Sequence, residues 1–227
     1  MDTVKIRAKI NGEDREFKNT EENGKNTVTF FADAKKRLIP LKGVASVEFD
    51  VSCYNDDYIL MPACAYNGNR FPSVKKKYPP MFSKEEAKIE NLITDVPRLN
   101  EDGSGKIEVT SADMSVPCVA IWDKLKKKAM LLFFEQELYG KNLGVTYTKG
   151  KIEITYPKYR ENKYEMCSLV QSHDKKAVIR PNQRFDFKYL LIERECESIT
   201  ELLRIFFENR NCLLYTSPSP RDPKTSR

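Results

Sequence analysis

Short runs of alternating apolar and polar residues follow one another along most of this chain, and they constrain its fold more than any other feature. Val4–Ile10 alternates with a period of two and leads into Asn11-Gly12, a dipeptide typical of tight hairpin turns. Similar strand-like runs recur at 27–31, 43–53, 58–66, 106–114, 117–123, 129–138 and 184–195. Helices do not alternate with these runs, which disfavours a parallel α/β sheet. The sequence therefore predicts a mainly β fold, a large antiparallel β-sandwich of about twelve strands.

One pair of runs predicts a compact hairpin. The segments 144–148 and 151–156 flank the turn signal Lys149-Gly150, and Ile152, Ile154 and Tyr156 occupy alternate positions. Because successive side chains in a strand point to opposite faces of the sheet, we expect these three residues to share one face.

Two segments predict helices instead. Ser83–Ile93 has the capping-box spacing, with Glu86 three residues after Ser83, and Ser198 and Glu201 begin a second helix in the same way. Apolar residues of the second helix cover more than one of its faces: Ile199, Leu202, Leu203, Ile205, Phe206 and Phe207. We expect the sandwich to cover one side of this helix and chain downstream of Asn211 to cover the other.

The final segment, Cys212–Arg227, differs from the rest of the chain. It resembles the translation of transposase-end and sequencing-adapter DNA, with 212–222 and 225–227 matching two adapter segments. A natural Ser/Pro-rich terminus is the alternative. We therefore expect a sandwich domain at 1–197, the start of a linker helix at 198–211 and a non-native tail at 212–227.

Charge and composition narrow the range of partners. The net charge of +6 is spread over 39 basic and 33 acidic residues, unlike the concentrated basic patch of a nucleic-acid-binding surface. The sequence shows neither the apolar core of a signal peptide nor a stretch long enough to span a bilayer. Outside the tail the cysteines are irregularly spaced, which indicates reduced thiols: Cys53, Cys64, Cys118, Cys167 and Cys196. We expect a cytoplasmic protein that binds neither nucleic acid nor membrane.

The sequence shows no self-contained catalytic motif. His173, the single histidine, lies in a polar turn, which favours a solvated loop residue over a general base. The sequence has no nucleophile elbow, no CxxC pair or His/Cys cluster for zinc, and no glycine-rich phosphate loop. It therefore predicts no catalytic residue, no metal and no cofactor.

The most informative stretch for function is Leu60–Pro72, with the sequence LMPACAYNGNRFP. Tyr66 offers an aromatic face for the C–H side of a sugar ring, and Asn67 and Asn69 offer amide donors and acceptors for hydroxyls. Arg70 can bond hydroxyls or a carboxylate. An apolar wall with a few polar groups is typical of small-ligand sites, which makes these four residues candidate substrate contacts. A plain hairpin turn at the Asn-Gly dipeptide is the alternative.

Trp122, followed by Asp123, is a second candidate for a sugar contact, as a platform for a sugar ring. Its placement at the end of an apolar strand favours a tryptophan in the core or at its rim, which is the alternative.

Several segments resemble the N-terminal super-sandwich domain of six-hairpin glycosidases. They are MPACAYNGNRF at 61–71, DVPRL at 95–99, SADMSVPCVAIWD at 111–123, KKAMLLFFEQE at 127–137 and FKYLLIERECESITELLRIFFENRN at 187–211. In such enzymes a linker helix joins the sandwich to an (α/α)6 toroid that carries the catalytic acids, and sandwich loops help to shape the sugar site.

The resemblance implies the front domain of a cytoplasmic glycoside hydrolase that acts on oligosaccharides. Its partners would be the carbohydrate substrate and the missing (α/α)6 domain of the same chain, and the fragment alone would be inactive. Tyr66, Asn67, Asn69 and Arg70 would lie in a substrate loop. A non-catalytic carbohydrate-binding module and the front domain of a polysaccharide lyase are the alternatives, because one fold serves many functions.

Overall fold

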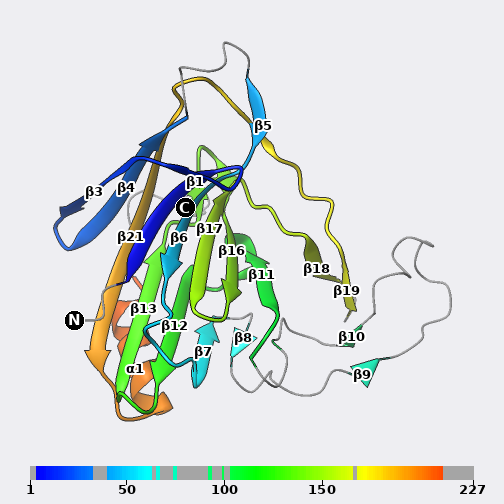
Figure 1. The fold of residues 1–227 in the computed structure, drawn as a ribbon. Helices are drawn as coiled ribbons and strands as arrows, with labels where there is room; N and C mark the ends of the chain where they lie inside the picture. Colours follow the sequence, from blue (N-terminus) through cyan, green and yellow to red (C-terminus); the bar gives the residue numbers. More distant parts are fainter. Residues whose placement is uncertain are drawn as a thin grey trace, which may run out of the picture.

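The computed structural model describes residues 4–32, 40–62, 65–66, 74–75, 92–93, 99, 103–165 and 168–211. Within them two antiparallel sheets pack face to face, and the helix α1 (Ile199–Asn209) lies on the outside of one sheet (Figure 1). This arrangement confirms the mainly β, antiparallel fold that the sequence predicts.

Sheet A has six strands in the spatial order β11 (Lys106–Thr110), β16 (Gly144–Thr148), β17 (Lys151–Tyr156), β6 (Ala45–Asp50), β1 (Lys5–Ile10) and β2 (Glu13–Arg15). Sheet B has seven in the order β3 (Phe17–Glu22), β4 (Lys25–Phe31), β21 (Arg184–Glu195), β13 (Lys128–Phe134), β12 (Cys118–Asp123), β7 (Tyr58–Met61) and β8 (Ala65–Tyr66).

Smaller two-stranded pairs lie around these sheets. They are β5 (Leu41–Gly43) with β20 (Ala177–Ile179), β9 (Val74–Lys75) with β10 (Leu92–Ile93), β14 (Glu137–Leu138) with β15 (Lys141–Asn142), and β18 (Asn162–Glu165) with β19 (Ser168–Gln171). A short 3-10 helix, η3 (Ser111–Asp113), follows β11.

The two predicted hairpins form as the turn signals indicate. Asn11 and Gly12 join β1 to β2 and both have positive φ, 52° and 81°. Positive φ at both central positions is the geometry of the type I′ turn, which Asn-Gly favours. β16 and β17 form the second hairpin, in which Val145 lies opposite Ile154.

The main core lies between the two sheets. Phe49 of sheet A meets Tyr189 of sheet B edge to face, with ring centroids 5.0 Å apart. Phe30 stacks on Phe185 and Phe187 at 5.4 and 5.8 Å. Ile152, Ile154 and Tyr156 are all buried in the same core, as their alternation predicts. Alternate residues of the strands therefore fill the space between the sheets.

A second apolar cluster lies on the outer face of sheet B, beneath α1. Its helix residues are Leu202, Ile205 and Phe206, and Phe206 stacks on Phe133 of β13 with centroids 6.0 Å apart. β12 and β13 therefore have covered surfaces on both faces. This explains why β13 is an almost continuous apolar run instead of an alternating one.

The predicted helix start is confirmed, with one difference. The Ser198 side chain accepts a hydrogen bond from the Glu201 amide at 3.2 Å, which satisfies one of the exposed N–H groups of the first turn. The Glu201 carboxylate accepts from the amide of Glu197 at 2.8 Å, one residue before the position that the capping box predicts. Opposite the packed face, Phe207 is 56% exposed. Cover by downstream chain stays a prediction.

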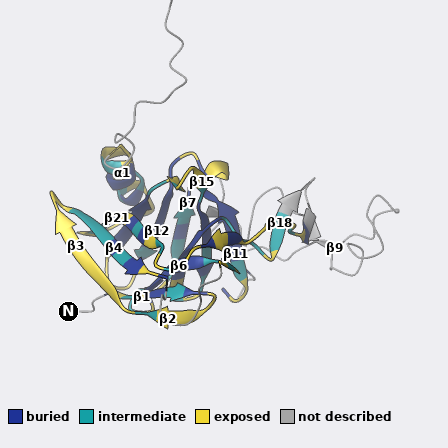
Figure 2. Ribbon diagram, turned by 90° about the horizontal axis from the view of Figure 1, so that it is seen from above, coloured by how far each residue is buried: buried dark blue, intermediate teal, exposed yellow. Residues whose placement is uncertain are grey.

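The predicted helix at 83–93 lies outside the described residues except for its last two, which form β10 instead. The strand β3 is exposed along its whole length at an edge of sheet B (Figure 2). In the part of the chain that the structure describes, no helix is long and apolar enough to cross a membrane.

Candidate functional site

Of the predicted sugar-contact residues, the structure describes Tyr66 and Trp122, and both lie in strands of sheet B. Tyr66 lies in β8, where its backbone pairs with Leu60 of β7. Asn67, Asn69 and Arg70 lie outside the described residues. Their role as substrate contacts stays a prediction.

Trp122 is half-buried in β12 and packs against the second apolar cluster. Its indole Nε1–H donates to the carbonyl of Cys196 at 2.9 Å. This bond ties the central part of sheet B to the turn that precedes α1. The ring therefore has a structural role, and a sugar contact through its exposed part stays a prediction.

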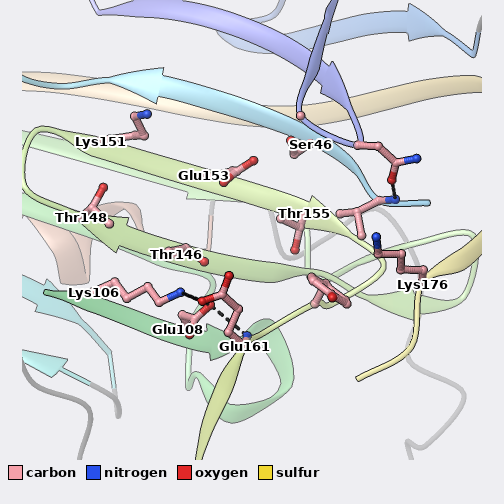
Figure 3. Close-up of a pocket in the computed structure, with 14 residues that line it drawn as sticks. Ser46, Lys106, Glu108, Thr146, Thr148, Lys151, Glu153, Thr155, Glu161 and Lys176 are labelled. Carbon is pink, nitrogen blue, oxygen red and sulfur yellow. Dashed lines mark hydrogen bonds and ion pairs between the residues drawn. The ribbon is translucent and has the colours of Figure 1, made fainter. Parts of the chain in front are cut away.

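A polar hollow among the described residues lies on the outer face of sheet A and has a volume of about 450 Å³ (Figure 3). We call it the polar groove. Its lining residues are Asn11, Gly12, Val44, Ser46, Lys106, Glu108, Thr146, Thr148, Lys151, Glu153, Thr155, Tyr159, Glu161 and Lys176. None of these lining residues is among the site residues predicted from the sequence.

Strand alternation places these side chains on the outside. In β17, Ile152 and Ile154 point into the core, so Glu153 and Thr155 point outward into the polar groove. The pairing register then aligns Glu108, Thr146, Glu153 and Glu48 across β11, β16, β17 and β6. Three carboxylates therefore share one row of the sheet.

Glu48 belongs to an ion-pair network beside the polar groove. Its side chain is almost fully buried and lies 2.6 Å from the Lys9 amine and 3.1 Å from the Lys151 amine. Burial alone would raise the pKa of Glu48, but the hydrogen bonds and charges of the two lysines outweigh it and lower the pKa. Glu48 is therefore ionised at neutral pH, and its charge is compensated.

Glu108 is compensated mainly by backbone amides. Its two carboxylate oxygens accept from the amides of Glu161 and Asn162 at 3.1 and 3.2 Å. The Lys106 amine lies 3.4 Å from Glu108 and also contacts the Glu161 carboxylate. Burial would lower the pKa of Lys106, but the two glutamates outweigh it and raise the pKa.

A buried ion pair fixes the segment that forms one wall of the polar groove. Arg160 donates from Nε to Asp174 at 2.8 Å, and its Nη1 lies 3.3 Å from Asp113 beyond β11. Burial would raise the pKa of Asp174, but the hydrogen bond and charge of Arg160 outweigh it and lower the pKa. Tyr159 and Glu161, the neighbours of Arg160, are thereby held in the wall.

Two side chains in the polar groove lack partners among the described residues. Thr155 is only 6% exposed, and its hydroxyl oxygen has no hydrogen-bond partner. This hydroxyl lies over Gly144, where an added Cβ would be 2.4 Å away from it. Glu153 is half-buried and has no ion-pair or hydrogen-bond partner in the described part of the chain. The polar groove can therefore supply the Glu153 carboxylate to a ligand, whereas the Thr155 hydroxyl oxygen is sealed over Gly144.

A second hollow of about 480 Å³ lies between α1 and the edge of sheet B. This apolar groove is lined by Leu60, Pro62, Ser115, Val116, Leu203, Phe206, Phe207, Arg210 and Asn211. Arg210 lies over the Phe207 ring, 5.2 Å from its centroid. The strand β7, which contributes Leu60, pairs with β8, where the predicted substrate loop begins.

Among the described residues, no group of three His, Cys, Asp or Glu side chains could hold a metal ion. The carboxylates of the polar groove are instead tied to lysines and amides, apart from Glu153. The chemistry that the groove offers is therefore hydrogen bonding and charge pairing, without a metal among these residues. Comparison of the chain with protein-family models, curated proteins and solved structures finds no match to any of them.

Proposed function

We propose that this chain is the carbohydrate-contacting sandwich domain of a glycoside hydrolase and that the polar groove binds part of a sugar chain. In this proposal the domain positions substrate and does not supply the catalytic acids. The observation that carries the proposal is the half-buried Glu153 carboxylate, which has no partner among the described residues and lies in a hollow lined also by the hydroxyl side chains of Ser46 and Thr146.

Ser46, Thr146 and Thr148 offer hydroxyl donors and acceptors in the polar groove, and Glu153 offers a carboxylate acceptor. Sugars present several hydroxyls at close spacing. A volume of about 450 Å³ is in the range of small-ligand sites.

The Tyr66, Asn67, Asn69 and Arg70 loop belongs to the proposal as a separate set of contacts. It begins at β8 in sheet B, whereas the polar groove lies on sheet A. We therefore propose that an oligosaccharide meets the domain at two places, one of which also borders the catalytic domain of the enzyme.

Calorimetric titration of the chain with a panel of neutral oligosaccharides tests the proposal. Thr146→Val removes a hydroxyl that lines the polar groove and should weaken sugar binding about tenfold or less, as expected for one neutral hydrogen bond. Thr20→Val is the matched control, because Thr20 is exposed in β3 far from the polar groove. Absence of binding to every sugar would refute the proposal, and glycosidase turnover by the purified chain would refute the division of roles.

A further inference from the structure

The strand β3 is an open edge of sheet B. Among the described residues it pairs only with β4, without a bulge, and every residue from Phe17 to Glu22 is exposed. Figure 2 shows this strand along the margin of the molecule. Proteins usually protect such an edge with a proline, a bulge, a covering element or charged side chains, because its free N–H and C=O groups can pair with another strand. In the part of the chain that the structure describes, β3 has only the charged side chains.

The turn between β3 and β4 decides which backbone groups of β3 are free. Positions 23 and 24 form a two-residue turn with φ of 53° and 75°, and Glu22 lies opposite Lys25. The residues beside such a turn form a hydrogen-bonded pair, and successive residues of a strand direct their N–H and C=O groups to opposite sides. Every second residue back from Glu22 therefore bonds to β4, whereas Asn19 and Glu21 direct their N–H and C=O groups outward.

These outward groups restrict how two copies of β3 can pair about a two-fold axis. In an antiparallel pair, two residues directly opposite each other either both bond across the pair or both face away from it. One register that meets this condition places Asn19 opposite Glu21 of the second copy, and each of the two symmetric pairs exchanges two N–H···O bonds. Thr20 then lies opposite its own counterpart, and Lys18 lies directly opposite Glu22 of the second copy.

The neighbouring registers lack this match of charges. One of them places Lys18 opposite Thr20, so that its charge has no opposite charge facing it. The other places Glu21 opposite Glu21 of the second copy, where like charges repel. The charges of β3 therefore favour one antiparallel register instead of preventing every pairing.

We propose that the free edge of β3 binds the same edge of a second copy of this chain, so that sheet B continues from one copy into the other. The backbone groups of Asn19 and Glu21 and two ion pairs between Lys18 and Glu22 hold the dimer together. The Asn19 side chain donates to the Tyr189 hydroxyl at 3.0 Å, which fixes β3 to its own sheet. Because the contact is short and its ion pairs are solvated, the dimer is weak and exchanges with the monomer. This inference is independent of carbohydrate binding.

Sedimentation equilibrium of the full 227-residue chain at low salt, over a wide range of concentration, tests the proposal. The wild type should dimerise reversibly. Lys18→Glu places a carboxylate opposite Glu22, and Glu22→Lys places an amine opposite Lys18, so each variant alone should dimerise about tenfold more weakly or worse. An equimolar mixture of the two variants has opposite charges at both pairs. It should form a heterodimer with an affinity within about threefold of the wild type.

Lys149→Glu is the matched control, because it makes the same charge change at an exposed position in the turn between β16 and β17 and should leave dimerisation unchanged. Thermal unfolding confirms that each variant is folded. Glu21→Pro is a second test that needs no change at Lys18 or Glu22. It removes an outward N–H group of an edge strand, where proline is tolerated, and should abolish the dimer.

A wild-type chain that stays monomeric at every concentration overturns the proposal. A dimer whose affinity survives both Lys18→Glu and Glu21→Pro also overturns it, because the contact would then lie elsewhere on the molecule. If the mixture of the two charge variants does not recover the affinity, the register and the proposal with it are wrong.

Discussion

Thr155 and Thr110 are both buried threonines of sheet A, but their hydroxyl groups have opposite surroundings. Thr155 is 6% exposed and its hydroxyl oxygen has no partner among the described residues. Thr110 is 2% exposed, and its hydroxyl oxygen accepts from the Ala112 amide at 3.1 Å at the start of η3. The same substitution, threonine to valine, should therefore change stability in opposite directions.

Valine replaces the hydroxyl group by a methyl group of similar size. At Thr155 it removes an unsatisfied buried hydroxyl, so we expect the free energy of unfolding to rise by about 1 kcal/mol. The gain is smaller than the full penalty, because the larger methyl group must fit over Gly144. At Thr110 the substitution removes a capping hydrogen bond and should lower the free energy of unfolding by about 1–2 kcal/mol.

Urea denaturation followed by far-ultraviolet circular dichroism measures both changes, and equal m-values show that the comparison concerns the folded state. Thr155→Ser keeps the hydroxyl group and serves as the control that should not gain stability. If Thr155→Val lowers stability as much as Thr110→Val does, the Thr155 hydroxyl has a partner.

Three further predictions concern the wall of the polar groove and the helix. Gly144→Ala places a Cβ 2.4 Å from the Thr155 hydroxyl oxygen and 3.2 Å from the Tyr159 amide; thermal unfolding should show a loss of about 1–3 kcal/mol, partly restored by Thr155→Ala. Asp174→Asn removes the nearer of the two carboxylates of the part-buried Arg160, which keeps Asp113 at 3.3 Å, and should lower the free energy of unfolding at neutral pH by about 1–3 kcal/mol. Because the folded-state pKa of Asp174 is lowered, its contribution is present above the unfolded pKa of about 3.9 and is lost as pH falls through the folded pKa. The difference between wild type and Asp174→Asn in a pH series of urea titrations should therefore shrink below about pH 4, and a constant difference would contradict the pairing. Phe206→Ala should lower the free energy of unfolding by about 3–5 kcal/mol, since Phe206 is 5% exposed, whereas Phe207→Ala should change it by less than about 1 kcal/mol; similar losses would show that Phe207 is covered.

The local features of the fold could be predicted from the sequence. The run at 184–195 coincides with β21, the Asn11-Gly12 turn joins β1 to β2, and Ser198 caps α1. Each depends on neighbouring residues only, through alternation, turn chemistry or a cap. The exposed strand β3 was not predicted, because a strand that is exposed on both faces has no apolar alternation to reveal it.

The polar groove could not be predicted, because its row of residues joins the β16–β17 hairpin to β6 and β11, which are far from the hairpin in the chain. Glu48, Glu108, Thr146 and Glu153 become neighbours only through the pairing register of β6, β11, β16 and β17. Each residue alone is an ordinary polar residue on the outer face of an alternating strand. The hydrogen bond of Trp122 could not be predicted for the same reason, since the Cys196 carbonyl that accepts it is 74 residues away in the chain.

The outer faces of the two sheets differ in the side chains that they carry, and this difference is the reason for proposing a ligand on sheet A. The outer face of sheet B is apolar at Cys118, Ala120, Leu131 and Phe133, and α1 covers it. The outer face of sheet A holds buried polar groups instead. Two of them, Glu48 and Glu108, are compensated by lysines and backbone amides. Glu153, in the same row, has no partner among the described residues. In the proposed function, Glu153 is therefore the position at which a ligand would add a hydrogen bond.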